Sequence, residues 1–235
     1  MKHATRLAAA VCAVLLSAPF AVFAQEESES PISWEIGAVS DYVWRGVSQS
    51  DENPTGQVGI TYTSPIGLYV GGWASGVDFG DGDPDFEVDY FVGYGWDVSD
   101  AVNLDFMLTR YTYPGASYSN YNEFTATATF AETYSVGVSY TNDVFNSGTD
   151  GWYYSLGGQW GLPNDFSISA NVGRSVFDDN DAAASKDYTD WGVSVGKDVG
   201  IVNFSLGYYG TDGNGRDSNG EWADNRVVFA IKVAK

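Results

Sequence analysis

The chain has a single histidine, His3, and a single cysteine, Cys12, and both lie in its first 24 residues. Residues 1–24 place basic residues before an apolar run and end at Ala24, which is the pattern of a cleaved secretory signal peptide. The mature chain would then have neither residue type. This excludes a Ser-His-Asp triad, a Cys-His pair, a thiolate metal site and an imidazole proton shuttle.

Long apolar runs are also missing, because no stretch after residue 24 approaches the roughly 18 to 20 residues that a spanning helix needs. The catalytic chemistry that remains is a carboxylate pair of the kind that glycosidases use. The chain has 31 Asp and Glu residues, so such a pair is expected without any catalytic role. We therefore predict no enzyme, no catalytic residue and no cofactor.

The sequence shows an alternation of side-chain type instead. In residues 85–96 the even positions are apolar or aromatic, whereas the odd positions are mostly acidic or small. Successive side chains of a strand point to opposite faces, so one face would be apolar and the other polar. Similar segments recur about twelve times over residues 32–235, each close to the roughly 9 to 11 residues of a barrel strand. Segment 67–77 leaves its inner and outer faces undecided.

Two further patterns distinguish a membrane barrel from a soluble sandwich. Aromatic residues tend to stand at both ends of an apolar face, as Tyr134 and Tyr140 do, which is where interfacial girdles lie. The linkers between segments alternate between short and long, as tight periplasmic turns and longer external loops would. We predict an all-β fold, a transmembrane antiparallel up-and-down barrel of about 12 strands. Residues 1–24 would be the signal peptide, 25–31 a short N-terminal periplasmic segment and 32–235 the outer-membrane barrel.

Five stretches resemble the TorF family of porins, also described as the Gcw_chp family. They read SDYVWRGVSQSDENP, EVDYFVGY, YTYPG, YTDWGVSVGK and RVVFAIKVAK, and the resemblance covers nearly all of the mature chain. It implies an outer-membrane barrel of proteobacteria with a channel role, with no agreed substrate and no catalytic residues. One departure is the end of the chain at Lys235, where barrel proteins usually carry an aromatic residue that the assembly machinery reads. Recognition by that machinery would then be weaker or use internal strands.

The stretch from Ser40 to Pro54 reads as the top of the first strand. Its parity places Tyr42 and Trp44 outward at the upper girdle, and Asp41 and Arg45 inside. Two interpretations stay open for the inner pair. Asp41 and Arg45 pair with each other in a polar lumen, or they line a constriction near the seam with the last strand, where Arg226 also points inward.

Charge indicates what the lumen would favour. The full chain has a formal net charge of −20, and loss of Lys2 and Arg6 with the signal peptide makes it −22. So acidic a chain excludes nucleic acid as a partner. A lumen with this excess would concentrate cations. The predicted acidic lumen residues are Glu35, Asp41, Asp85, Glu87, Asp89, Asp105, Glu123 and Asp190, and the basic ones are Arg45, Arg226 and Lys232.

Acidic runs also raise the question of a metal site. Residues 81–89 carry a carboxylate at every second position, which Ca²⁺ could use, but they lack the ligand and glycine spacing of an EF-hand loop. We predict a solvated acidic wall and no metal site. Arg110 and Arg174 stand on the outward parity near the outer strand ends, where they could meet lipopolysaccharide phosphates or simply snorkel.

The sequence thus predicts an outer-membrane channel for passive diffusion of small hydrophilic solutes, with a preference for cations. Its expected partners are outer-membrane lipid and lipopolysaccharide, small solutes or cations, and the assembly machinery. The alternative is a closed structural or adhesive barrel whose acidic loops bind partners or ions. A secreted lectin-like sandwich is a third reading.

Overall fold

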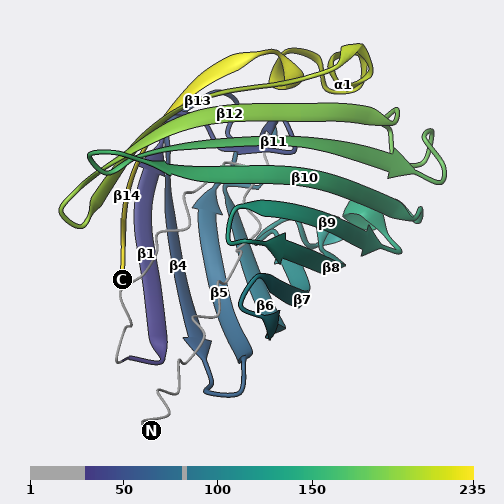
Figure 1. Cartoon of the computed structure of the whole chain (residues 1–235). Coiled ribbons are helices and arrows are strands. Elements are labelled where there is room, and N and C mark those ends of the chain that lie inside the picture. The colour runs from purple at the N-terminus through teal and green to yellow at the C-terminus, as the bar shows by residue number, and fades with distance from the viewer. Residues whose placement is uncertain (1–29, 81–83) are drawn as a thin grey trace, which may run out of the picture.

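The computed structural model describes residues 30–80 and 84–235, and these form one closed antiparallel barrel of twelve strands (Figure 1). β1 pairs with β4 on one side and with β14 on the other, which closes the ring and confirms the predicted fold class. The barrel strands are β1 Ile32–Val39, β4 Thr55–Thr63, β5 Leu68–Gly76, β6 Phe86–Ser99, β7 Val102–Thr112, β8 Tyr121–Phe130, β9 Tyr134–Thr141, β10 Gly151–Leu162, β11 Phe166–Phe177, β12 Tyr188–Val199, β13 Val202–Thr211 and β14 Arg226–Ala234.

Short and long connections alternate around the ring, as the sequence predicts. We call the two ends of the barrel the turn end and the loop end. The turn end carries connections 64–67, 100–101, 131–133, 163–165 and 200–201, and the loop end carries 40–54, 77–85, 113–120, 142–150, 178–187 and 212–225. The loops contain β2 Val43–Trp44, β3 Val47–Ser48, η1 Ser117–Ser119, η2 Val144–Asn146, α1 Gly213–Asn219 and η3 Gly220–Ala223.

No helix in residues 30–80 and 84–235 is long and apolar enough to cross a membrane. The predicted signal peptide, residues 1–24, and most of segment 25–31 lie outside the described residues.

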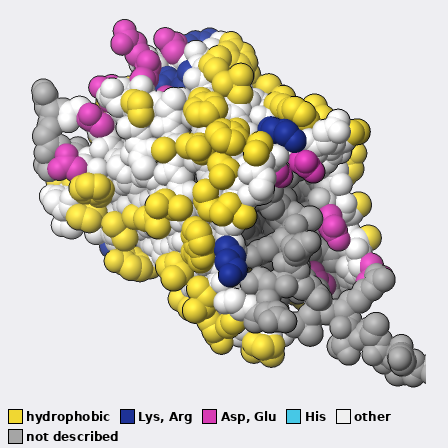
Figure 2. Space-filling model, turned by 90° about the vertical axis from the view of Figure 1, so that its left-hand side faces the viewer, with side chains coloured by type: hydrophobic (Ala, Val, Ile, Leu, Met, Phe, Trp, Pro, Cys, Tyr) yellow, Lys and Arg dark blue, Asp and Glu magenta, His cyan; other side chains and the backbone are white. Residues whose placement is uncertain are grey.

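The outer wall of the barrel is apolar because alternate side chains of every strand point away from the lumen. Large hydrophobic side chains on this wall are exposed, and Figure 2 shows them as a broad band across the surface. β5 resolves the undecided segment, since Leu68 and Val70 are exposed whereas Tyr69 and Trp73 are buried on the inner face. Such a wall is compatible with lipid and would be costly in water.

The parity of β13 supplies a matched pair of substitutions. Leu206 is exposed on the outer wall, and its neighbour Ser205 is on the inner parity, near the middle of the strand. We expect Leu206→Arg to destabilise the barrel in lipid by about 2–4 kcal/mol, because it places a charge near the bilayer midplane. Ser205→Arg should cost clearly less. Urea unfolding of the refolded variants in lipid vesicles measures both, and equal losses would contradict the assigned faces.

Candidate functional site in the barrel lumen

The lumen is lined by small hydroxyl side chains on one part of the wall. Thr125 on β8 and Ser139 on β9 are hydrogen-bonded at 2.8 Å, and so are Ser169 on β11 and Ser194 on β12. All four are buried. This region of the inner wall is therefore polar without carrying charge.

Tyrosines cover other parts of the inner wall in a repeated arrangement. Tyr69 on β5 lies over Gly93 of β6, where an added Cβ would be 2.2 Å from its ring, and its hydroxyl donates to Asp105 of β7 at 3.0 Å. Tyr153 on β10 makes the same two contacts with the next two strands. It lies over Gly173 of β11 and donates to Asp190 of β12 at 3.1 Å. Each ring thus lies along the wall because the middle strand offers a glycine and the next a carboxylate.

The loop 40–54 leaves the wall and folds into the lumen, which the sequence does not predict. Tyr42 is 3% exposed, and Trp44 packs against Tyr111 of β7 with ring centroids 6.2 Å apart. The expectation that Tyr42 and Trp44 face outward in an upper girdle is therefore wrong. The period of two no longer applies, because β1 ends at Val39 and the residues after it have left the barrel ladder.

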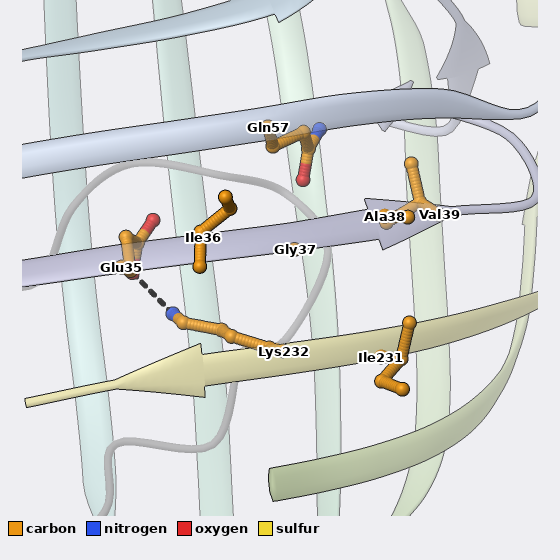
Figure 3. Close-up of a pocket in the computed structure, with 8 residues that line it drawn as sticks. All are labelled: Glu35, Ile36, Gly37, Ala38, Val39, Gln57, Ile231 and Lys232. Atoms are coloured by element: carbon orange, nitrogen blue, oxygen red, sulfur yellow. Dashed lines mark ion pairs between the residues drawn. The ribbon is translucent and has the colours of Figure 1, made fainter.

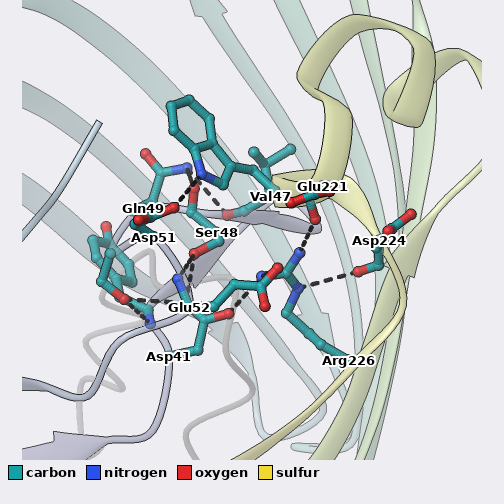
Figure 4. Close-up of polar contacts among 12 residues, drawn as sticks. Asp41, Val47, Ser48, Gln49, Asp51, Glu52, Glu221, Asp224 and Arg226 are labelled. Carbon is teal, nitrogen blue, oxygen red and sulfur yellow. Dashed lines mark hydrogen bonds and ion pairs between the residues drawn. The ribbon is translucent and has the colours of Figure 1, made fainter. Parts of the chain in front are cut away.

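The base of this hairpin is held by Asp41. One carboxylate oxygen accepts hydrogen bonds from Ser48 at 2.6 Å and Ser50 at 3.1 Å, and the other pairs with Arg226 of β14 at 2.7 Å (Figure 4). Arg226 also donates to the backbone oxygen of Glu221 in the last loop. We call the Asp41–Arg226 pair the base clamp. It ties the hairpin to the seam between the first and last strands.

The tip of the hairpin is held by Arg45. Its guanidinium lies 2.8 Å from both carboxylate oxygens of Glu123 on β8, and it stacks 4.1 Å from the ring centroids of Trp44 and Tyr153. Burial alone would lower the pKa of Arg45, but the charge of Glu123 raises it, so the side chain stays protonated. We call the Arg45–Glu123 pair the tip clamp. Asp41 and Arg45 therefore do not pair with each other, and each has a partner on the wall.

Aromatic side chains from three other long loops or their flanking strands gather beside the hairpin. Phe145 of η2 contacts Trp44, Tyr113 and Tyr121, with ring centroids 5.0 to 6.4 Å apart. Phe79 packs on Tyr113 at 5.9 Å. The loop end of the lumen is thus narrowed by a hairpin with an aromatic layer beside it. No sequence motif marks this cluster, and the only signal is the richness of these loops in aromatic residues.

The remaining predicted lumen residues fall into two groups. Glu35 and Lys232 form an ion pair across the β1–β14 seam, near the turn end (Figure 3). Glu87, Asp89, Asp105 and Asp190 are buried on the inner face and form no ion pair within the described part of the chain.

Asp85 does not belong to the lumen. It is exposed and precedes the first residue of β6, so the acidic alternation begins before the strand does. Its assignment as a lumen residue is wrong for that reason.

Two other features concern ions and lipids. Within residues 30–80 and 84–235, no three carboxylate, histidine or cysteine side chains converge as a metal site would require. Arg174 on β11 donates to Thr189 of β12 at 3.1 Å and lies 3.6 Å from Asp212 in the loop after β13, so side chains of the same barrel already engage it. Arg110 is exposed on the outer wall, where it contacts Asn122 at 3.4 Å.

The model of a family described as "Bacterial protein of unknown function (Gcw_chp)" matches residues 24–233 of the chain. No curated protein matches it.

Solved structures of similar fold include outer-membrane channels. The NanC porin has a TM-score of 0.57 and 11% identity over 86% of this chain and 98% of its own. The KdgM porin has a TM-score of 0.55 and 7% identity over 86% and 98% of the two chains. The COG4313 outer membrane channel from Pseudomonas putida F1 has a TM-score of 0.50 and 10% identity over 89% and 97%. At such identities the likeness extends to the fold alone.

The contact between Tyr153 and Gly173 can be tested by adding a methyl group at the glycine. In Gly173→Ala the new Cβ would be 2.0 Å from the Tyr153 hydroxyl, so we expect a loss of about 1–3 kcal/mol in the free energy of unfolding. Gly161→Ala is the matched control, because an added Cβ there has no neighbour within 4 Å. Urea unfolding checks both variants. The cost of Gly173→Ala should largely disappear in a Tyr153→Ala background, and a cost that persists would contradict the contact.

Proposed function

The chain belongs to the Gcw_chp family of bacterial proteins, and we propose that it is an outer-membrane channel for passive diffusion of small hydrophilic solutes. The observation that carries this is the closed ring of twelve strands with an apolar outer wall and a polar inner one. Only a closed barrel satisfies all backbone hydrogen bonds of strands placed in lipid. The stretches quoted above support its placement among the TorF porins.

The charge of the inner wall supports a preference for cations. Seven of the predicted acids lie inside, namely Glu35, Asp41, Glu87, Asp89, Asp105, Glu123 and Asp190, against the three bases Arg45, Arg226 and Lys232. Seven minus three leaves a formal excess of four negative charges. Each base pairs with one of these seven acids, and Arg226 also lies 3.5 Å from Glu52 of the hairpin, so the formal excess resides on Glu87, Asp89, Asp105 and Asp190. Low-dielectric walls strengthen the attraction of such charges for cations.

The same excess argues against acidic solutes. The KdgM porin has been solved in complex with disordered oligogalacturonate, which is a polyanion. A similar chain of carboxylates would be repelled by the interior of this barrel, since its three bases are already paired. We therefore expect neutral or cationic solutes to pass in preference.

The inward hairpin favours a second candidate function. It crosses the lumen from its base at β1 to Glu123 on β8, and Gly46 at its tip packs against Thr211 of β13. A barrel that stays closed in this way would be structural or adhesive, with its acidic loops as the binding surface. Ion conductance of the refolded protein in a planar bilayer separates the two functions.

Selectivity can be measured as a reversal potential under a KCl gradient. We expect the native channel to favour K⁺. Glu87→Gln together with Asp89→Asn lowers the lumen excess from four to two and should move the reversal potential toward zero, most clearly at low salt. Asp85→Asn is the control, because Asp85 is exposed outside the lumen and should leave the potential unchanged. An anion-selective native channel would contradict the proposed preference.

Orientation in the membrane can be tested with a protease. We expect trypsin added to intact cells to cut at Lys186 or Arg216, which lie in loop-end connections. Lys197 lies near the turn end of β12 and contacts Asn164 and Asp165 of the adjacent turn, so it should be protected until the outer membrane is opened. Peptide mapping by mass spectrometry identifies the sites. Cleavage at Lys197 in sealed cells would mean the opposite orientation.

A further inference from the structure

We propose that Glu123 and the aromatic rings beside it form a recognition site for a guanidinium group, which Arg45 fills as a tethered ligand. A solute that carries a guanidinium group would compete with Arg45 and release the hairpin from the lumen. Such a site would give the channel a solute class and a means of opening, and its physiological meaning rests on the proposed channel function.

The site has the chemistry that a planar cation requires. Glu123 is 2% exposed, and a buried carboxylate without a charged or hydrogen-bonding partner is strongly destabilising. It therefore requires a cation or water beside it. It presents both oxygens to the guanidinium, and the Tyr111 hydroxyl lies 3.4 Å from one of them. The Tyr153 ring supplies a face 4.1 Å from the guanidinium carbon. Three of these groups, Glu123, Tyr111 and Tyr153, belong to the wall and stay there if the hairpin moves.

The backbone conformation at Arg45 does not favour arginine, which indicates that the contacts of the side chain account for this residue. Arg45 and Gly46 form the two-residue turn of the hairpin, with φ of 50° and 78°. Turns with two left-handed residues favour Asn, Asp or Gly at the first position, since a longer side chain is strained there. Arginine gives the turn no advantage, so the contacts of its guanidinium must offset the strain.

Apart from the tip clamp, the tip of the hairpin contacts the wall through side-chain packing, of Trp44 on Tyr111 and of Val47 beside Tyr188, and within the described residues it has no backbone pairing to a barrel strand. β2 and β3 have two residues each and pair only with each other, and an isolated two-stranded hairpin is marginally stable at best. Its base is held separately, by the base clamp and by a bridge from Ser50 to Asp78. Loss of the tip clamp can therefore free the tip while the base stays in place. Val47, which is 7% exposed beside Tyr188, would become accessible.

Accessibility of Val47 supplies the test. A Val47→Cys chain in a Cys12→Ser background, folded in lipid vesicles, is treated with a membrane-impermeant maleimide at constant ionic strength. We expect methylguanidinium at millimolar concentration to raise the labelling rate several-fold. Tetramethylammonium, a cation without N–H donors, should leave it near the rate in KCl. Equal rates in all three salts, or equal acceleration by both organic cations, would overturn the proposal.

Arg45→Lys provides the matched variant. It keeps the charge but loses the planar guanidinium, which stacks on the Trp44 and Tyr153 rings while its Nη2 contacts both oxygens of Glu123, so lower concentrations of methylguanidinium should release the hairpin. Arg45→Lys with the same concentration dependence as the native residue would contradict the tethered-ligand role. Labelling does not require ion flow. A labelling response without conductance would support the guanidinium site and contradict the channel function. Conductance without the labelling response would contradict only the guanidinium site.

Discussion

Closure of the ring without a free edge is the constraint on which the rest of this structure depends. Because β1 pairs with both β4 and β14, every strand has a lumen face and an outer face, and the period of two sends one kind of side chain to each. The apolar side chains face outward, so most of the charged side chains of the strands lie in a narrow interior, whereas Arg110 is exposed on the outer wall. Confined charges are stable only when paired or hydrated. The three ion pairs of the lumen, and through two of them the position of the hairpin, follow from that confinement.

The barrel wall could be predicted from the sequence because its rule is local. Alternation fixes the strand faces, and the linker lengths fix the up-and-down order. The rule does not apply where the ladder stops. The parity that predicts Tyr42 and Trp44 to face outward ends at Val39, and the pattern that predicts Asp85 to face inward starts before β6.

Interactions between strands distant in sequence could not be predicted. The face of segment 67–77 depends on Gly93, one strand away, which leaves room for the Tyr69 ring inside the barrel. The partners of Arg45 and Arg226 are 78 and 185 residues away along the chain, and alternation says only that all four members face the interior. Spacing along one strand contains no information about which inward groups meet across the lumen. The ion pairs therefore depend on the three-dimensional arrangement of the closed ring.

The base clamp also imposes an order on folding. Arg226 opens the last strand, so Asp41 has no cationic partner at the seam until β14 has docked on β1. The hairpin lies near the start of the barrel sequence, but its base clamp can form only after the final strand has docked. Formation of the base clamp is thus a late step, and it requires a complete wall. A chain stalled before the last strand would lack this tether, and its hairpin would be held only by contacts with other strands, such as the pair of Arg45 with Glu123.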